Sequence, residues 1–136
     1  MNVQFSAAFY ALKTYLGEKI PEFTEIVVHW IEPNNASDGL AMLLPESHYT
    51  EDGKITFNAD LWFYTVKPNR PEDVVSDQVA IMEKVFNAVY SSGALPLPIL
   101  KAVISESEYR NDLPKPSGTG LAHARIEMIM EFDDDC

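Results

Sequence analysis

The longest alternation of hydrophobic and polar positions in the chain lies between Lys54 and Val66. Side chains of a strand point alternately to its two faces, so this alternation predicts one long antiparallel strand. The second face begins polar and becomes aromatic at Trp62 and Tyr64, which predicts that another part of the molecule covers that end. The first face is apolar throughout and is assigned to the core: Ile55, Phe57, Ala59, Leu61 and Phe63.

Two segments show the spacing of three to four residues that is typical of an amphipathic helix. The first spans residues 2–17, and the second follows Pro71 and runs to Ser91. Asn69 is the expected N-cap of the second helix, and Gly93 is its expected terminator. The spacing in this second helix assigns the following stripe to the core: Val75, Val79, Met82, Phe86 and Val89. Three further residues widen this apolar face: Val74, Ile81 and Val85.

Shorter apolar or alternating segments predict four further strands, and Asp52-Gly53 predicts a hairpin turn. The resulting order, α-β-β-β-α-β-β, predicts an α+β fold, a mostly antiparallel sheet of about five strands with two helices packed on one face. Residues 1–132 are expected to form a single domain, followed by an acidic tail at 133–136. The four strands are expected at 24–31, at 40–44 where Pro45 closes the strand, at 99–105 and at 121–132.

The charge balance of the chain excludes some partners. Its 136 residues carry a formal net charge of −11, which argues against a nucleic-acid surface and against an anionic membrane surface. Cys136 is the one cysteine, so no internal disulfide forms. We see neither a secretory signal nor an apolar run long enough to span a membrane, and we expect a cytosolic product.

The sequence contains no motif that predicts catalysis or metal binding. His29, His48 and His123 lack the spacing of paired ligands, and the acidic pairs fall at a helix start, a loop edge and the tail. The G-x-S-x-G pattern of a serine nucleophile is absent, and the glycines at 118 and 120 lack the lysine of a phosphate-binding loop. We therefore expect no enzyme activity, no metal and no cofactor.

The outward face of the long strand is the best candidate for a functional surface. Asp60, Trp62 and Tyr64 combine polar and aromatic side chains, as the cores of protein interfaces do, and we take them as a candidate subunit interface. The alternative is that a helix of the same monomer covers this face. A long loop from Glu108 to Gly120 is a second candidate for binding.

The order of these segments resembles that of the tail-terminator, or tail-completion, proteins of tailed bacteriophages. The resemblance covers most of the chain in pattern, without a signature motif. It departs from the expected pattern at the proline-rich LPLP junction, which affects the fifth strand. The segments that carry it are FSAAFYALKTYL, EIVVHW, ADLWFYTVK and NRPEDVVSDQVAIMEKVFNAV, followed by two strands around a loop.

The resemblance implies a non-enzymatic virion protein, assembled in the cytoplasm of a bacterial host. Its copies would form a ring, typically a hexamer, that caps the tail tube and meets the head connector. An acidic channel would let DNA slide without binding. The loop expected to contact the tube or line the lumen comprises Lys115, Pro116, Ser117, Gly118, Thr119 and Gly120.

Two other functions remain open at the level of sequence. The chain could be a small α+β ligand-binding domain or an enzyme of unknown substrate, with a pocket between helices and sheet. It could also be a component of a tail-like injection or secretion machine, which is built around a similar tube.

Overall fold

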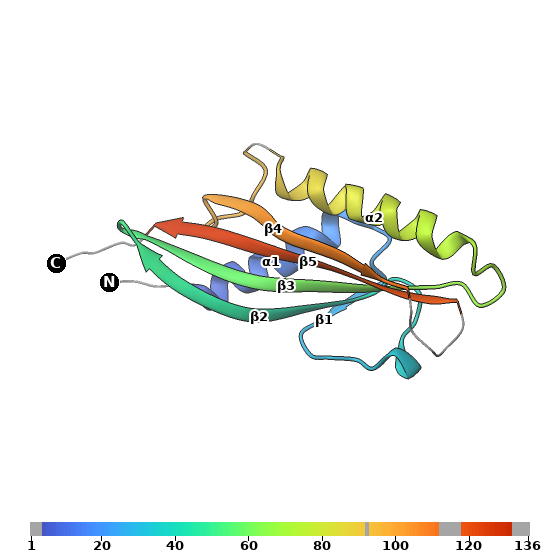
Figure 1. Cartoon of the computed structure of the whole chain (residues 1–136). Helices are drawn as coiled ribbons and strands as arrows, with labels where there is room; N and C mark the ends of the chain where they lie inside the picture. Colours follow the sequence, from blue (N-terminus) through green and yellow to red (C-terminus); the bar gives the residue numbers. More distant parts are fainter. Residues whose placement is uncertain (1–3, 92, 112–117, 132–136) are drawn as a thin grey trace.

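The computed structural model describes residues 4–91, 93–111 and 118–131. Within these residues the chain forms two α-helices, one short 3-10 helix (η1) and five strands (Figure 1). The predicted α+β class and the order α-β-β-β-α-β-β are confirmed. The elements are α1 (Phe5–Lys19), β1 (Glu25–Val27), η1 (Pro33–Asn35), β2 (Leu40–Glu51), β3 (Lys54–Val66), α2 (Asp73–Val89), β4 (Lys101–Arg110) and β5 (Thr119–Glu131).

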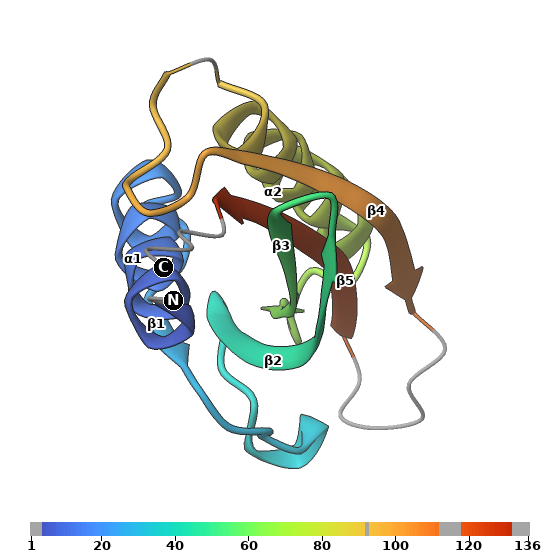
Figure 2. The ribbon, with the colours of Figure 1, turned by 90° about the vertical axis from the view of Figure 1, so that its left-hand side faces the viewer.

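The strands form one sheet in the order β1-β2-β3-β5-β4 (Figure 2). β1 runs parallel to β2, and the other neighbouring strands are antiparallel. β3 pairs with β5 along its whole length, from Lys54 opposite Glu131 to Val66 opposite Thr119. The long alternating strand predicted from the sequence is therefore the centre of the sheet, with the predicted bounds.

The main core lies between the two helices and one face of the sheet. The apolar face of β3 contributes Leu61 and Phe63, and β5 contributes Ala124 and Ile126, all fully buried. Leu12 of α1 belongs to the same cluster, as do apolar residues of α2. Because one face of an antiparallel sheet takes both helices, its opposite face is left without a helix. We call that opposite face the open face.

The segment that follows β1 crosses part of the open face and covers its aromatic end. Tyr64 is fully buried there, in a small cluster with Leu40, Met42 and Leu121. The Tyr64 hydroxyl donates a hydrogen bond to the backbone oxygen of Ile31 over 2.7 Å, which pins the crossing segment to β3. The prediction that something covers this end is confirmed, although the cover is this segment and not a helix.

The predicted ends of the first two strands are wrong because tertiary contacts decide where each strand stops. The strand expected at 24–31 ends at Val27, where the chain leaves the sheet edge to cross the open face. The strand expected to stop at Pro45 continues to Glu51, and a bulge between Pro45 and Ser47 accommodates the proline. The hairpin predicted at Asp52-Gly53 is confirmed, with positive φ at both residues.

The second helix confirms only part of its predicted apolar face. Met82 and Val89 of the stripe are buried, as are Val74, Ile81 and Val85, which widen it. Val75 and Val79 are 54% and 48% exposed, so their assignment to the core is wrong. The helix begins at Asp73, and Asn69 does not cap it. Apolar residues on both sides of this helix allow more than one stripe, and packing on the sheet selects one: Val74, Gln78, Ile81, Met82, Val85, Ala88 and Val89 are buried.

Candidate functional site

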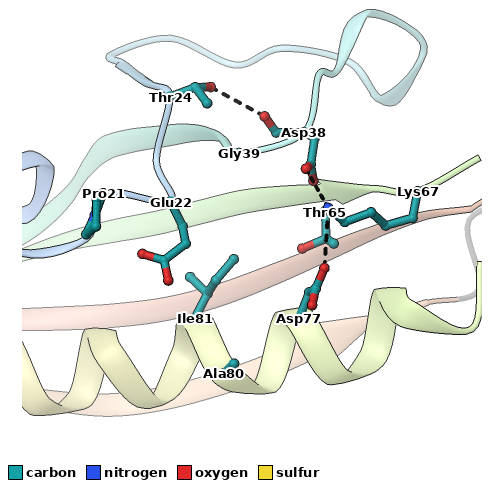
Figure 3. Close-up of a pocket in the computed structure, with 10 residues that line it drawn as sticks. All are labelled: Pro21, Glu22, Thr24, Asp38, Gly39, Thr65, Lys67, Asp77, Ala80 and Ile81. Carbon is teal, nitrogen blue, oxygen red and sulfur yellow. Dashed lines mark hydrogen bonds and ion pairs between the residues drawn. The ribbon is translucent and has the colours of Figure 1, made fainter. Parts of the chain in front are cut away.

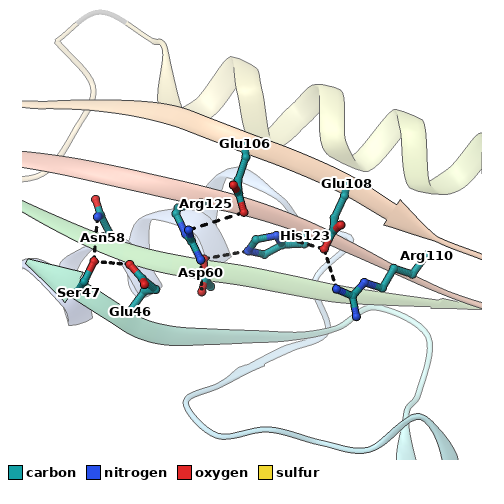
Figure 4. Close-up of polar contacts among 9 residues, drawn as sticks. All are labelled: Glu46, Ser47, Asn58, Asp60, Glu106, Glu108, Arg110, His123 and Arg125. Atoms are coloured by element: carbon teal, nitrogen blue, oxygen red, sulfur yellow. Dashed lines mark hydrogen bonds and ion pairs between the residues drawn. The ribbon is translucent and has the colours of Figure 1, made fainter.

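The open face carries a cluster of ionisable side chains from two neighbouring strands. Asp60 of β3 lies directly opposite Arg125 of β5, and both point away from the helices (Figure 4). The Arg125 guanidinium donates to both carboxylate oxygens of Asp60, from Nε to Oδ1 over 2.9 Å and from Nη2 to Oδ2 over 3.3 Å. His123 Nε2 lies 2.9 Å from the same Oδ1 atom. One carboxylate therefore joins two basic side chains.

β4 extends this cluster with two more carboxylates. Glu106 lies opposite Arg125, with 3.7 Å between its Oε1 and Arg125 Nη1, and Glu108 lies opposite His123, with 3.8 Å between its Oε1 and His123 Nδ1. The bulge between Ile104 and Glu106 sets this register. Opposite charges thus face each other across three strands, in an ion-pair network made of Asp60, Glu106, Glu108, His123 and Arg125.

The surroundings of Asp60 keep it charged. Burial by itself would raise the pKa of this carboxyl, but hydrogen bonds from Arg125 and His123 outweigh burial and hold the pKa below its ordinary value of 3.8. The hydrogen bond to Asp60 likewise raises the pKa of Arg125. Asp60 and Arg125 therefore form a permanent ion pair near neutral pH.

Asp60→Asn is expected to lower the free energy of unfolding near neutral pH by about 1–3 kcal/mol, because Arg125 and His123 lose an ionised acceptor. The lowered folded-state pKa means that this stabilisation is fully present above pH 3.8 and is lost as pH falls through the folded-state value. Denaturant unfolding of both proteins at neutral and strongly acidic pH measures the difference. Glu83→Gln, at an exposed position of α2, is the control. A difference that persists in strong acid would contradict the assignment.

His123 is held in one orientation on the open face. Its ring is 3% exposed and stacks on Trp62, with ring centroids 4.1 Å apart and an interplanar angle of 22°. Because the ionised Asp60 only accepts hydrogen bonds, the Nε2 atom of His123 donates to it. The Nδ1 atom has no hydrogen-bond partner among the described residues, and Glu108 is the nearest charged group to it.

Aromatic and cationic groups lie beside this network and reach the surface. Trp30, in the segment that crosses the open face, packs edge-on against Trp62 with ring centroids 5.3 Å apart. The Arg110 guanidinium lies 5.3 Å from the centre of the Trp62 ring and forms an ion pair with Glu108 over 3.1 Å. Trp30 remains 42% exposed. We call Trp30, Trp62 and Arg110 the tryptophan cluster.

The histidine and aspartate resemble part of a general-base arrangement, but the nucleophile is missing from the described residues. A nucleophile must lie within hydrogen-bond distance of the base. Within the described ranges, no hydroxyl or thiol is hydrogen-bonded to His123, and Arg125 already occupies Asp60. This arrangement holds β3, β4 and β5 together on the open face, and the described residues assemble no catalytic triad around it.

The other two histidines lie outside the network. His48 of β2 packs against Phe5, with ring centroids 4.5 Å apart, and His29 follows β1. Across residues 4–91, 93–111 and 118–131, no three histidine, cysteine, aspartate or glutamate side chains are grouped so that they could hold a metal ion. Cys136 and residues 133–135 of the predicted acidic tail lie outside the described residues.

The candidate subunit interface is divided by the structure. Asp60 and Trp62 lie on the open face and are partly exposed, so their contact with a partner stays a prediction. Tyr64 has no exposed surface and is part of the monomer core. Its assignment to an interface stays a prediction, and its burial argues against it, because residues 28–37 cross the strand at the place where a partner would have to bind.

The candidate tube-contacting loop is shorter than predicted. Lys115, Pro116 and Ser117 lie outside the described residues, and Gly118 forms a turn whose oxygen accepts a hydrogen bond from the Lys67 backbone over 2.7 Å. Thr119 and Gly120 belong to β5 and are buried, so the predicted loop bound at Gly120 is wrong. Their contact with a tube or a lumen stays a prediction. β4 also runs to Arg110, five residues beyond the predicted strand end at 105.

Sequence reasoning missed most of the ion-pair network. The alternation of His123, Arg125 and Glu127 placed these residues on the polar face of the last strand, but it could not reveal which strand lies beside them. Opposite charges on two strands are a weak signal that the strands pair side by side. Here the charges are Arg125 on the last strand and Asp60 on the long strand. The register of β3 against β5 turns that signal into a contact between Asp60 and Arg125.

No protein-family model matches this chain, and no curated protein matches it significantly. Neither helix in the described part of the chain is long and apolar enough to cross a membrane. Any function must therefore be inferred from the contacts above.

Proposed function

We propose that this protein is a non-enzymatic structural subunit of the phage tail-terminator type, whose copies assemble into a ring. The observation that carries the proposal is the tryptophan cluster. Trp30 is 42% exposed and rests on Trp62, which in turn is held by His123 and Arg110. Tryptophan, tyrosine and arginine dominate the energetic centres of protein interfaces, and a preorganised exposed indole has little side-chain entropy left to lose on binding.

A second exposed apolar surface lies on the other side of the molecule. Val75 and Val79 are one helical turn apart on α2, and both point away from the sheet. A ring needs two different surfaces on each copy, because each subunit contacts the next one head to tail. The tryptophan cluster and this pair of valines lie on opposite layers, the open face and the helical layer, and so meet that requirement.

In this proposal the ion-pair network supports the tryptophan cluster. It fixes the backbone beneath Trp62, so that the indole is presented in one orientation. The net charge of −11 favours a partner surface with basic side chains and disfavours phosphate contact with DNA in a channel. The tail tube, the head connector and a virion location follow from the resemblance and are part of the same proposal.

Trp30→Ser is expected to weaken ring assembly by at least about 30-fold, as loss of an interface hot spot of about 2 kcal/mol would. The monomer should stay folded, because Trp30 lies at the edge of the small cluster and not within it. Size-exclusion chromatography with light scattering and electron microscopy, with and without tail tubes, measure the assembly.

Tyr49→Ser is the matched control, since Tyr49 is 47% exposed near the hairpin that joins β2 and β3. It should leave assembly unchanged. A wild-type protein that stays monomeric at high concentration and forms no ring on tail tubes would contradict the proposal.

A further inference from the structure

The sheet has an unpaired edge along β2. β1 pairs only with residues 40–42 of β2 and ends at Val27, where the chain leaves the line of that strand (Figure 1). In the described part of the chain, no strand and no backbone hydrogen bond lies on the outer side of residues 43–51. We call residues 43–51 of β2 the free edge. An unpaired strand edge presents a row of N–H and C=O groups and is a template for one more strand.

An apolar pocket of about 330 Å³ opens beside the free edge. Pro45 of the free edge forms one wall, and Val28, the first residue after β1, forms another. The pocket therefore lies where a strand that continued the line of β1 would run. The other residues that line it come from α1 and β3: Phe5, Ser6, Phe9, Tyr10 and Phe57.

Solvent reaches this pocket, and its lining carries no charged side chain. Tyr10 and Val28 are exposed at its rim. Phe9 and Phe57 are buried and belong to the main core, and the Phe5 ring packs edge-on against Phe57 with ring centroids 5.2 Å apart. A packed aromatic floor with an exposed apolar rim suits an apolar side chain from outside the molecule.

A second pocket, of about 350 Å³, is a weaker candidate for a binding site. It opens between α2, the end of β3 and the segment that joins α1 to β1 (Figure 3). Lys67 Nζ lies 2.8 Å from Asp38 Oδ2 and 3.4 Å from Asp77 Oδ2, and Glu22 pairs with Lys84. The charges that line this pocket are therefore already paired within the chain, whereas the apolar pocket adjoins an unpaired strand.

The free edge also carries negative charge. Glu46 and Glu51 of β2 and Asp52 of the following turn are exposed, and none of them forms an ion pair in the described part of the chain. Lys54 is the only basic residue among the β3 residues that pair with β2. Charge complementarity therefore favours a basic occupant.

We propose that the free edge binds an extended, basic segment of another protein, which adds one more strand to the sheet. Main-chain hydrogen bonds to β2 would hold the segment, and an apolar side chain from one of its faces would enter the apolar pocket. A bulge interrupts β2 between Pro45 and Ser47, and proline donates no N–H, so the segment would pair chiefly with residues 47–51. The proposal uses no residue of the tryptophan cluster and does not rest on ring assembly.

The probe is a hexapeptide of alternating lysine and valine with acetylated and amidated ends, measured by calorimetry and by NMR of the full chain at physiological salt. We expect saturable binding of one peptide per chain, with shifts of the amide signals of Val28 and of residues 47–51. No saturable binding, or shifts confined to other residues, would overturn the proposal. A chain that pairs with a second copy through these residues and excludes the peptide would also overturn it.

N-methylation of the peptide tests the main-chain hydrogen bonds. Successive N–H groups of a strand point to opposite edges, so methyl groups on the valine nitrogens block one edge and methyl groups on the lysine nitrogens block the other. One of these two peptides should bind at least about 10-fold more weakly than the other, because it loses its donors to β2 while it keeps its charge and side chains. Equal affinities of the two peptides would contradict strand addition.

Val28→Ser removes apolar surface from the pocket wall without adding charge. We expect peptide binding to weaken at least about 5-fold, with an unchanged midpoint of denaturant unfolding, because Val28 is exposed. Leu97→Ser is the matched control, since Leu97 is 80% exposed between α2 and β4 and does not line the pocket. It should leave peptide binding unchanged. Equal effects of the two substitutions would refute the pocket as part of the site.

Glu51→Gln tests whether the charge of the free edge acts locally. It should weaken peptide binding, whereas Glu83→Gln, at an exposed position of α2, should leave it unchanged, because physiological salt screens charges more than about 8 Å apart. Equal losses would mean that the peptide only follows net charge, and would overturn the proposal. Failure of the peptide to bind leaves ring assembly untouched, since that is measured through Trp30→Ser.

Discussion

Tyr64→Ala is expected to lower the free energy of unfolding by about 3–5 kcal/mol, the cost of removing a fully buried aromatic ring. The Tyr64 ring fills the small cluster beneath residues 28–37, where the structure leaves it no exposed surface. Its hydroxyl also holds the backbone of Ile31 over 2.7 Å. Denaturant unfolding followed by circular dichroism measures the loss.

Tyr64→Phe separates the hydrogen bond from the packing. It keeps the ring and removes the hydroxyl, so we expect a loss of about 1 kcal/mol. Burial, with a smaller contribution from Glu32, raises the pKa of Tyr64 to about 12 from 10.0. The stabilisation is therefore fully present below pH 10 and is lost as pH rises towards 12, so the stability advantage of the wild-type protein over the Tyr64→Phe variant should shrink over this pH range.

The effect of Tyr64→Ala also decides whether Tyr64 belongs to the monomer core or to a subunit interface. A Tyr64→Ala protein with wild-type stability that fails to assemble would contradict the core assignment and return the residue to a subunit interface. We expect the reverse order of effects: Trp30→Ser disrupts assembly in a folded monomer, and Tyr64→Ala disrupts the monomer itself.

Gly39→Ala is expected to destabilise the protein by about 3 kcal/mol or more. Gly39 has φ of +83°, in the left-handed region that costs other residues about 1–2 kcal/mol. A Cβ atom would also lie in steric overlap with the backbone oxygen of Glu22, and close to the Thr24 side chain, at 3.1 Å. Because the nearest atom belongs to the backbone, the overlap can be relieved only if the two segments separate.

Gly53→Ala is the matched control for Gly39→Ala. Gly53 has a similar φ of +76°, but a Cβ atom there would meet nothing within 4 Å. It therefore carries the conformational cost alone, about 1–2 kcal/mol. Thermal or denaturant unfolding of the two variants gives the steric contribution as their difference. Equal losses would show that the close approach of Gly39 to Glu22 does not constrain the fold.

Most helices and strands were identified from local patterns, because the formation of these elements depends on residues that are neighbours in the sequence. The alternation of β3 and the hairpin turn at Asp52 and Gly53 follow from period and turn chemistry, and both were predicted correctly. The hydrophobic pattern failed where two different faces of a helix were equally apolar. Val75 and Val79 fit an apolar helical stripe as well as Val74 does, and only packing against β5, β4 and β3 decides which of them is buried.

The candidate site was less predictable than the fold, since its contacts join distant segments. Asp60 was singled out in the sequence, but its partners His123 and Arg125 are 63 and 65 residues away. Trp30 was assigned to a strand at 24–31, and the structure instead places it beyond the end of β1, at the surface and against Trp62.

The sequence by itself determined which side chains of β3 and β5 face the core, because a period of two leaves each strand one apolar face to bury. It also determined the α+β class, through the order and type of the elements. Only the tertiary structure decided that residues 28–37 bury Tyr64 and leave Trp30 exposed on the open face. The physical reason is that covering a sheet face depends on where the chain leaves the sheet edge, after Val27, and no local period encodes that departure.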